Sequence, residues 1–208
     1  MPVHIVNHPL ITHKISVIRD KRLGTRDFRT IVSEITLLLT YEATRDFPLK
    51  EVEIETPVCT TRARVLPDEG RVFLIPILRA GLGMVPGMLD IFPLGKVAHI
   101  GLRRNERTAL PETYYYNLPE GIEGATAIIV DPMLATAGSL SAAISLVKKN
   151  RPRVIRAICL IAAPEGRERI ERDHPDVDVY VAAMDERLDE RKYIVPGLGD
   201  AGDRMFGT

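Results

Sequence analysis

Short apolar runs constrain the fold of this chain more than any other feature. They lie within RVFLIPIL, KVAHIGL, TAIIVD, RVIRAICLIAA and VDVYVAAM, which begin at residues 71, 96, 126, 153 and 177. Most are apolar at successive positions, which is typical of strands buried on both faces. Because helix-like stretches separate them, we predict an α/β fold with a mostly parallel sheet and helices on both faces.

The predicted helices follow from apolar residues at helical spacing. An N-terminal helical extension is expected from Thr25, its N-cap, until Pro48 stops the pattern. Further helices are predicted from Gly81 to Leu89, after residue 138, and in PEGRERIERDH, whose charged face is expected to be solvated. The apolar positions that carry the first and third predictions are Phe28, Ile31, Val32, Ile35, Leu39, Leu140, Ala143, Ile144 and Val147.

Length and composition exclude several classes of protein. The 208 residues suit one domain over residues 1–208. Lys plus Arg and Asp plus Glu both number 28, so zero net charge argues against nucleic-acid binding through bulk charge. Cys59 and Cys159 fit no disulfide or zinc pattern, which indicates a reducing cytoplasm. No apolar run approaches the ~18 residues of a membrane-spanning helix.

An anion-binding loop is predicted in IIVDPMLATAGSL, residues 128–140. Asp131 ends the strand, and small or hydroxyl-bearing residues follow where a helix begins. Free N–H groups at a helix N-terminus, with the hydroxyls, favour a phosphate. A carboxylate would repel that phosphate, so Asp131 should face a sugar diol, or a metal bound to it, on the same ligand. The same small residues also suit a capped helix without a ligand.

This loop resembles the ribose-5-phosphate loop of the type I phosphoribosyltransferases. More narrowly, DPMLAT, ILRAGLGM (residues 77–84) and YIVPGLGDAGDRMFGT (residues 193–208) resemble the uracil phosphoribosyltransferases, and the likeness covers nearly the whole chain. The resemblance implies that uracil and 5-phosphoribosyl 1-diphosphate (PRPP) give UMP and diphosphate, a pyrimidine-salvage reaction.

The resemblance also implies which residues bind PRPP. Arg79 and Arg104 are expected to bind the diphosphate, because guanidinium offers bidentate donors to phosphate oxygens. Together with Asp131, which should hold the ribose hydroxyls, they are the predicted catalytic residues. A surface ion pair for Arg79 and a solvated basic cluster around Arg104 stay open as alternatives. The whole predicted PRPP set is Arg79, Arg104, Asp131, Pro132, Met133, Leu134, Ala135, Thr136, Ala137, Gly138, Ser139 and Asp200.

The resemblance places uracil at Ile194, Gly199, Asp200 and Ala201, largely through backbone N–H and C=O groups, with Asp200 also reaching the sugar or its metal. The implied cofactor is Mg²⁺, held mainly by substrate oxygens and water, without a dedicated protein site. Residues 103–121 show no helical or strand periodicity, and we expect a loop that closes over the diphosphate as a lid.

Three residues depart from the pattern of the family. Ala137 and Lys192 stand where glycine is usual, and Arg103 stands where an aromatic residue is common. If the backbone at residue 137 has positive φ, alanine costs about 1 kcal/mol there.

The expected partners are uracil and PRPP, with no nucleic acid and no membrane. The apolar early helix and Tyr114, Tyr115 and Tyr116 favour a homo-oligomer, a dimer or tetramer. Because some relatives are activated by GTP, a GTP activator is also expected. Two other functions stay open: a nucleotide-sensing RNA-binding regulator with the same fold, and a purine phosphoribosyltransferase.

Overall fold

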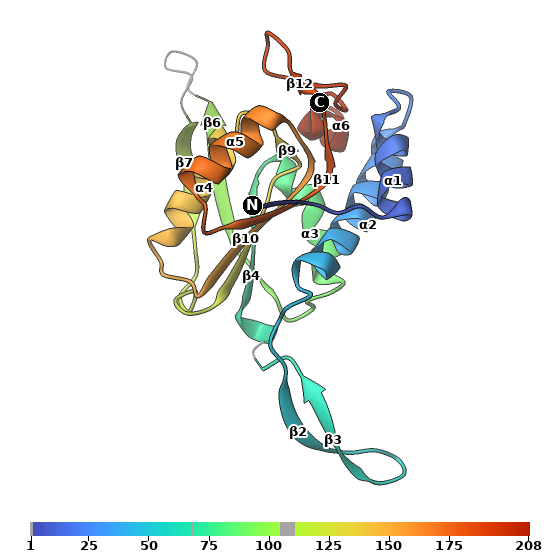
Figure 1. The fold of residues 1–208 in the computed structure, drawn as a ribbon, viewed down its shortest axis with the longest axis vertical. Helices are drawn as coiled ribbons and strands as arrows, with labels where there is room; N and C mark the ends of the chain where they lie inside the picture. The colour runs from blue at the N-terminus through green and yellow to red at the C-terminus, as the bar shows by residue number, and fades with distance from the viewer. Residues whose placement is uncertain (1, 68, 105–110) are drawn as a thin grey trace.

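A central sheet with helices on both faces forms the body of the protein (Figure 1). The computed structural model describes residues 2–67, 69–104 and 111–208, apart from the side chains of residues 69, 104 and 111. The sheet strands, in spatial order, are β1 (Val3–Ile5), β11 (Asp178–Met184), β10 (Val154–Ala162), β8 (Thr126–Val130), β4 (Val72–Leu78), β6 (His99–Arg104) and β7 (Pro111–Asn117). Two short strands extend it, β5 (Lys96–Val97) beside β4 and β9 (Met133–Leu134) beside β10.

The predicted parallel sheet is confirmed. Every neighbouring pair in it is parallel except β6 and β7, which are antiparallel. On β4 and β8, Leu74 and Ile128 pack on one face, and Ile75 and Ile129 pack on the other. β4 is apolar throughout, and so is β8 after Thr126, because helices cover both faces.

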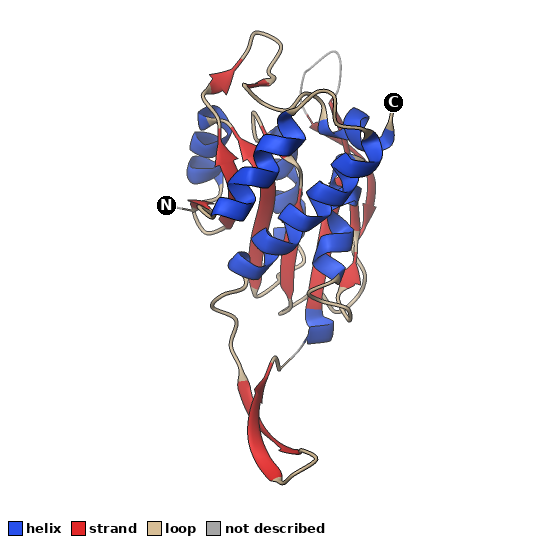
Figure 2. Cartoon of the chain, turned by 90° about the vertical axis from the view of Figure 1, so that its right-hand side faces the viewer, coloured by secondary structure: helices blue, strands red, loops and turns tan. Residues whose placement is uncertain are grey.

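The helices form two layers (Figures 1 and 2). One layer holds α1 (Pro9–Arg19), α2 (Thr25–Ala43), α3 (Val85–Leu89) and α6 (Ala201–Phe206), and the other holds α4 (Gly138–Lys148) and α5 (Pro164–Asp173). The N-terminal helix is confirmed as α2, although Gly24 and not Thr25 is its N-cap, and it ends at Ala43, before Pro48. None of the helices described here is long and apolar enough to cross a bilayer.

Several strand regions, including β1 and the two described next, were not predicted from the sequence. Residues 111–117, expected to be part of a loop, form β7 along the sheet edge, where the Arg103 Nε donates to Glu112 Oε2 at 3.1 Å. The expected lid also includes residues 105–110, which lie outside the described residues. The second difference is an unpredicted hairpin of β2 (Lys50–Glu55) and β3 (Thr60–Val65), which projects from the body (Figure 2).

The remaining short elements surround the ends of the sheet. They are the 3₁₀ helices η1 (Glu69–Arg71) and η2 (Ala80–Met84) and the paired strands β12 (Arg187–Leu188) and β13 (Ile194–Val195). η2 follows β4 and so lies at its carboxyl end. β13 leads toward α6, and Ala80 of η2 and Ile194 of β13 line the same cavity, described below.

Candidate active site

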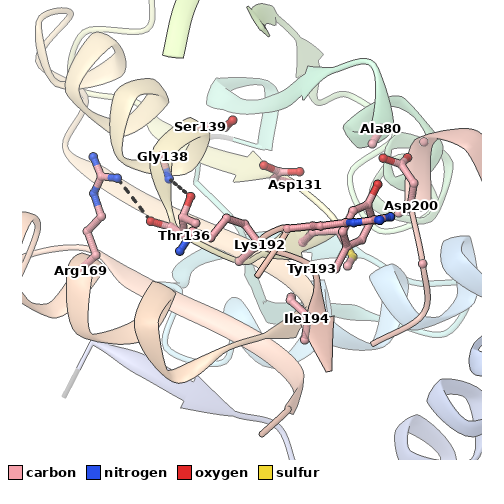
Figure 3. A pocket seen from close by; sticks show the side chains of 16 residues that line it. Ala80, Asp131, Thr136, Gly138, Ser139, Arg169, Lys192, Tyr193, Ile194 and Asp200 are labelled. Atoms are coloured by element: carbon pink, nitrogen blue, oxygen red, sulfur yellow. Dashed lines mark hydrogen bonds between the residues drawn. The ribbon is translucent and has the colours of Figure 1, made fainter. Parts of the chain in front are cut away.

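A cavity of about 620 Å³ lies at the carboxyl end of β8, where ligands bind in open α/β sheets. Its lining residues come from four segments far apart in the chain. Figure 3 shows Asp131 between Thr136 and Ser139 on one side and Ala80 and Asp200 on the other. The lining residues are Ala80, Asp131, Met133, Ala135, Thr136, Gly138, Ser139, Arg169, Arg191, Lys192, Tyr193, Ile194, Gly199, Asp200, Ala201 and Gly202.

The first wall is residues 131–139, the loop predicted from the sequence to bind a phosphate and called the phosphate loop below. Its backbone is joined to β10: the Asp131 N–H donates to Ile158 O at 3.2 Å, and Pro132 O accepts the Leu160 N–H at 3.0 Å. The Thr136 Oγ1 accepts the Gly138 N–H at 3.4 Å. The loop therefore presents hydroxyls and the N-terminus of α4 to the cavity, as an anion site requires.

Ala137 has φ 58° and ψ 12°, so the left-handed conformation considered from the sequence is present. Its side chain is buried and does not line the cavity, and neither do Pro132 and Leu134. These three members of the predicted PRPP set are buried and contribute to the packing of the loop, not to the cavity surface. Met133, Ala135, Thr136, Gly138 and Ser139 do line the cavity, as expected of the PRPP set.

The Asp131 carboxyl is half-buried at the strand end. Burial raises its pKa from 3.8 to about 7, and the Met133 N–H acts in the opposite direction by hydrogen bonding. Near neutral pH the group can therefore donate or accept a hydrogen bond toward the cavity. A carboxyl in this state suits vicinal hydroxyls, and a bound cation would favour its ionised form.

Of the two predicted arginines, only Arg79 has a side chain that the structure describes. Arg79 is exposed at the end of β4, and it forms no ion pair or side-chain hydrogen bond with another described residue. The next residue, Ala80, lines the cavity. The Arg104 backbone ends β6, but its side chain lies outside what the structure describes.

Close backbone contact brings η2, which follows Arg79, to the cavity edge. A Cβ on Gly81 would lie 2.6 Å from Val130 O, and one on Gly83 would lie 1.6 Å from Met205 Sδ. The absence of side chains therefore lets η2 pack against both β8 and α6.

The second wall is the C-terminal loop, residues 193–201. Ile194, Gly199, Asp200 and Ala201 all line the cavity, so the structure brings the whole predicted uracil set together. Gly199 has φ 81°. The Asp200 Oδ1 caps α6 by accepting the Asp203 N–H at 2.9 Å. The cap and the left-handed glycine set the backbone conformation of the stretch that lines the cavity.

Comparisons with known proteins agree with this geometry. The profile of the family described as uracil phosphoribosyltransferase matches residues 5–208. The chain belongs to the uracil phosphoribosyltransferase family.

Curated uracil phosphoribosyltransferases are similar over nearly the full length. Those of Clostridium tetani and Geobacillus kaustophilus are 57% and 56% identical, covering 98% and 99% of this chain and 97% and 98% of theirs. A solved structure from Aquifex aeolicus has a TM-score of 0.94 and 39% identity, over 99% of this chain and 98% of that one. A hypoxanthine phosphoribosyltransferase from Trypanosoma cruzi is similar in fold, at TM-score 0.51 and 17% identity, covering 80% of this chain and 76% of its own.

Four polar side chains that line the cavity were not among the site residues predicted from the sequence. Arg169, expected on a solvated face of α5, is half-buried, and its Nη1 donates to Thr136 O at 3.3 Å. Arg191, Lys192 and Tyr193 also line the cavity. Residue spacing could not reveal Arg169, because the contact depends on how α5 packs. The sequence did carry a signal at Lys192, because this lysine stands where the family usually has glycine. The structure gives it a φ of 70°, a conformation that favours glycine.

Magnesium, which the resemblance implies for a uracil phosphoribosyltransferase, fits the donor groups of this cavity. Asp131 and Asp200 supply carboxylates, and within residues 2–67, 69–104 and 111–208 no three His, Cys, Asp or Glu side chains cluster as metal ligands. One or two carboxylates with substrate oxygens and water form a usual Mg²⁺ environment.

Proposed function

We propose that this chain transfers 5-phosphoribose from PRPP to uracil, forming UMP and diphosphate. The observation that carries the proposal is the placement of Asp131 between the phosphate loop and the C-terminal loop (Figure 3). A ligand with a phosphate at one end, a sugar in the middle and a base at the other end matches that order.

The phosphate loop is proposed to hold the 5′-phosphate of PRPP. The α4 N-terminus, the Thr136 and Ser139 hydroxyls and the backbone of residues 135–138 supply donors. Arg169 lies beside Thr136, with its Nη1 3.3 Å from the Thr136 carbonyl oxygen, while its Nε donates to Asp173 Oδ2 at 3.3 Å. Its guanidinium keeps free N–H groups after these bonds, which suits a phosphate neighbour.

Arg79 and Arg104 are proposed to bind the diphosphate. Breaking the bond between ribose C1 and the diphosphate oxygen puts negative charge on the leaving group, and guanidinium groups stabilise that charge. Arg79 is exposed and unpaired among the described residues, so it is available for this role.

Asp131 is proposed to orient the ribose through its hydroxyls while positive charge builds at C1. The C-terminal loop would hold the uracil nitrogen N1 in line with C1, so that the base attacks as the diphosphate leaves. No covalent enzyme intermediate is needed. Closure of the cavity around the substrates would keep water from the activated ribose.

Mg²⁺ is the proposed cofactor, with Asp131 and Asp200 as its available protein ligands. When bound, it would neutralise part of the diphosphate charge as the leaving group departs.

A homo-oligomer, GTP activation and a cytoplasmic location complete the proposal. Phe28, Val32, Ile35 and Leu39 of α2 are buried within the chain and thus do not support association. Tyr41 of α2 and Tyr114, Tyr115 and Tyr116 of β7 are exposed and do. Cys59 and Cys159 are unbonded thiols, as in a reducing compartment. Activation by GTP rests on the resemblance alone and is tested by adding GTP to the activity assay.

The direct test is formation of UMP from PRPP, uracil and Mg²⁺ by the purified chain, with hypoxanthine in a parallel reaction. UMP from uracil and negligible product from hypoxanthine are expected. Preference for hypoxanthine would favour the purine alternative. RNA capture at moderate salt, with and without UMP, distinguishes the regulator alternative, for which binding should depend on UMP.

A further inference from the structure

An ion pair that is largely buried attaches the C-terminal loop to helix α1. Arg19, the last residue of α1, donates through Nη1 to Asp185 Oδ2 at 2.8 Å and through Nη2 to Asp185 Oδ1. The same Nη1 donates to Gly197 O at 2.6 Å, and the Gly197 N–H donates to Asp185 Oδ2 at 2.9 Å. This Arg19–Asp185 clamp therefore holds both polar groups of residue 197.

Burial removes the two charged side chains of the clamp from most of their water, which costs free energy unless their polar groups are bonded. The Asp185 side chain is 4% exposed and that of Arg19 is 24% exposed. A bidentate pair in such a place needs its remaining donors and acceptors satisfied. Here the Gly197 backbone satisfies them, so the ion pair and the conformation of the loop depend on each other.

Arg204 of α6 makes a second, independent link between the same two regions. It donates to Leu198 O at 2.9 Å and to Asp20 O at 2.6 Å, and it also bonds Ile18 O. Its guanidinium lies 4.4 Å from the centroid of the Phe28 ring. The carbonyls at the end of α1, which lack helical partners, are thus bonded to an arginine that also holds the C-terminal loop.

The loop needs such support because glycines give it freedom. Gly197 and Gly199 have φ 65° and 81°, conformations that glycine adopts readily but does not hold by itself. Backbone groups that recognise a base must stay within about 0.5 Å of the productive geometry. The clamp bonds the peptide groups on both sides of Gly197, two residues before Gly199.

We propose that Arg19 and Asp185 are positioning residues for the base: they fix Gly197 and thereby align the C-terminal loop with the pyrimidine. The inference rests on the proposed function, in which this loop binds uracil. Neither residue lines the cavity. Their effect should therefore fall mainly on uracil, with a smaller effect on PRPP through Asp200, the member of the predicted PRPP set that lies on this loop.

Steady-state kinetics on Arg19→Gln, Asp185→Asn and Arg19→Lys test the proposal, with uracil and PRPP varied in turn. The KM for uracil should rise about 10-fold or more in the first two variants, while the KM for PRPP stays within about 3-fold. Arg19→Lys should raise the KM for uracil less, since an ammonium keeps the charge but loses the planar fork. General destabilisation would not produce this split.

Arg22→Gln is the matched control, because Arg22 forms an exposed ion pair with Asp20 close to the same helix end. It should change neither KM. If Arg19→Gln fails to fold, Arg19→Lys decides: a rise in the KM for uracil alone supports the clamp. Unchanged or equally raised KM values in folded variants would overturn it, whereas wild-type protein inactive with uracil would overturn the proposed function instead.

Discussion

The two walls of the cavity are built in different ways. The phosphate loop is one continuous segment, held by neighbouring strands and the start of α4. The C-terminal loop is held by Arg19, Asp185 and Arg204, which come from α1, the end of β11 and α6. If the proposed roles hold, the anion site needs only local sequence at a strand end, whereas the loop proposed to recognise a base through its backbone depends on distant residues to hold it.

The largest effect is expected at the diphosphate. Arg79→Ala should lower kcat/KM by about 100-fold or more, because charge on the leaving group would go unneutralised. Arg79→Lys should recover part of the loss, since bidentate geometry is absent. Steady-state kinetics measure both variants, with Arg45→Ala, a change in an exposed pair with Glu42, as the control. Near-normal kcat/KM in Arg79→Ala would contradict the role of Arg79.

Thr136→Val tests whether the two walls bind different parts of the substrates. Affinity for PRPP should fall by about 1.5–3 kcal/mol, the range for a hydrogen bond to a charged group. Affinity for uracil should change far less. Titration of each ligand measures the difference, and Thr30→Val, on the exposed side of α2, should affect neither. Equal losses for both ligands would mean that the phosphate loop is misassigned.

Asp131→Asn should stabilise the ligand-free protein at pH 8 while impairing catalysis. The pKa of this group is raised from 3.8 to about 7 on folding, so the unfolded state releases its proton first. Its contribution lowers the free energy of unfolding as pH rises from about 4 to about 7. Asparagine cannot ionise, so the variant escapes this loss. At pH 8 its free energy of unfolding should exceed that of wild type by at least about 1 kcal/mol, which corresponds to a Tm increase of about 2–4 °C.

Thermal unfolding at pH 4 and pH 8 measures the change, which should be smaller at pH 4. Asp176→Asn is a control of opposite sign, because Lys148 lowers the pKa of Asp176 by hydrogen bonding. That carboxylate contributes stability above its unfolded pKa, and the contribution is lost as pH falls. An Asp131→Asn protein no more stable than wild type at pH 8 would argue against a raised pKa.

The smallest effects compare two residues with positive φ, Ala137 within the phosphate loop and Lys192 just before the C-terminal loop. Ala137 and Lys192 both have positive φ, so glycine at either position should raise the free energy of unfolding by up to about 1 kcal/mol. Ala137→Gly should leave the KM for PRPP unchanged. Lys192→Gly also removes a cation that lines the cavity, so the KM for PRPP should rise on the order of 3-fold. Denaturant unfolding and kinetics on both variants test this contrast.

Local features of the sequence predicted much of the fold and the first wall. Strands such as β4 are apolar throughout because both faces are covered, and that pattern is visible in seven residues. The phosphate loop likewise follows from residues adjacent in the chain. Strand β7 escaped prediction because its described residues are exposed along the sheet edge, so burial imposes no alternation on them.

Features that depend on tertiary packing could not be predicted. Arg169 lies 33 residues from Thr136, and Arg19 lies 166 residues from Asp185. In the sequence these side chains look like ordinary surface charges. The C-terminal loop was located by family resemblance, and its means of support required the structure.

The most direct test of backbone recognition is the ratio of kcat/KM for uracil to that for cytosine, at saturating PRPP and Mg²⁺. Uracil presents acceptors at O2 and O4 with a donor at N3, which alternating N–H and C=O groups of a fixed backbone can match. Cytosine reverses two of these groups, and unpaired polar groups in a closed site are costly. We predict a ratio of about 10⁴ or more, with 5-fluorouracil accepted like uracil. Comparable values for cytosine and uracil would contradict recognition by the C-terminal loop backbone.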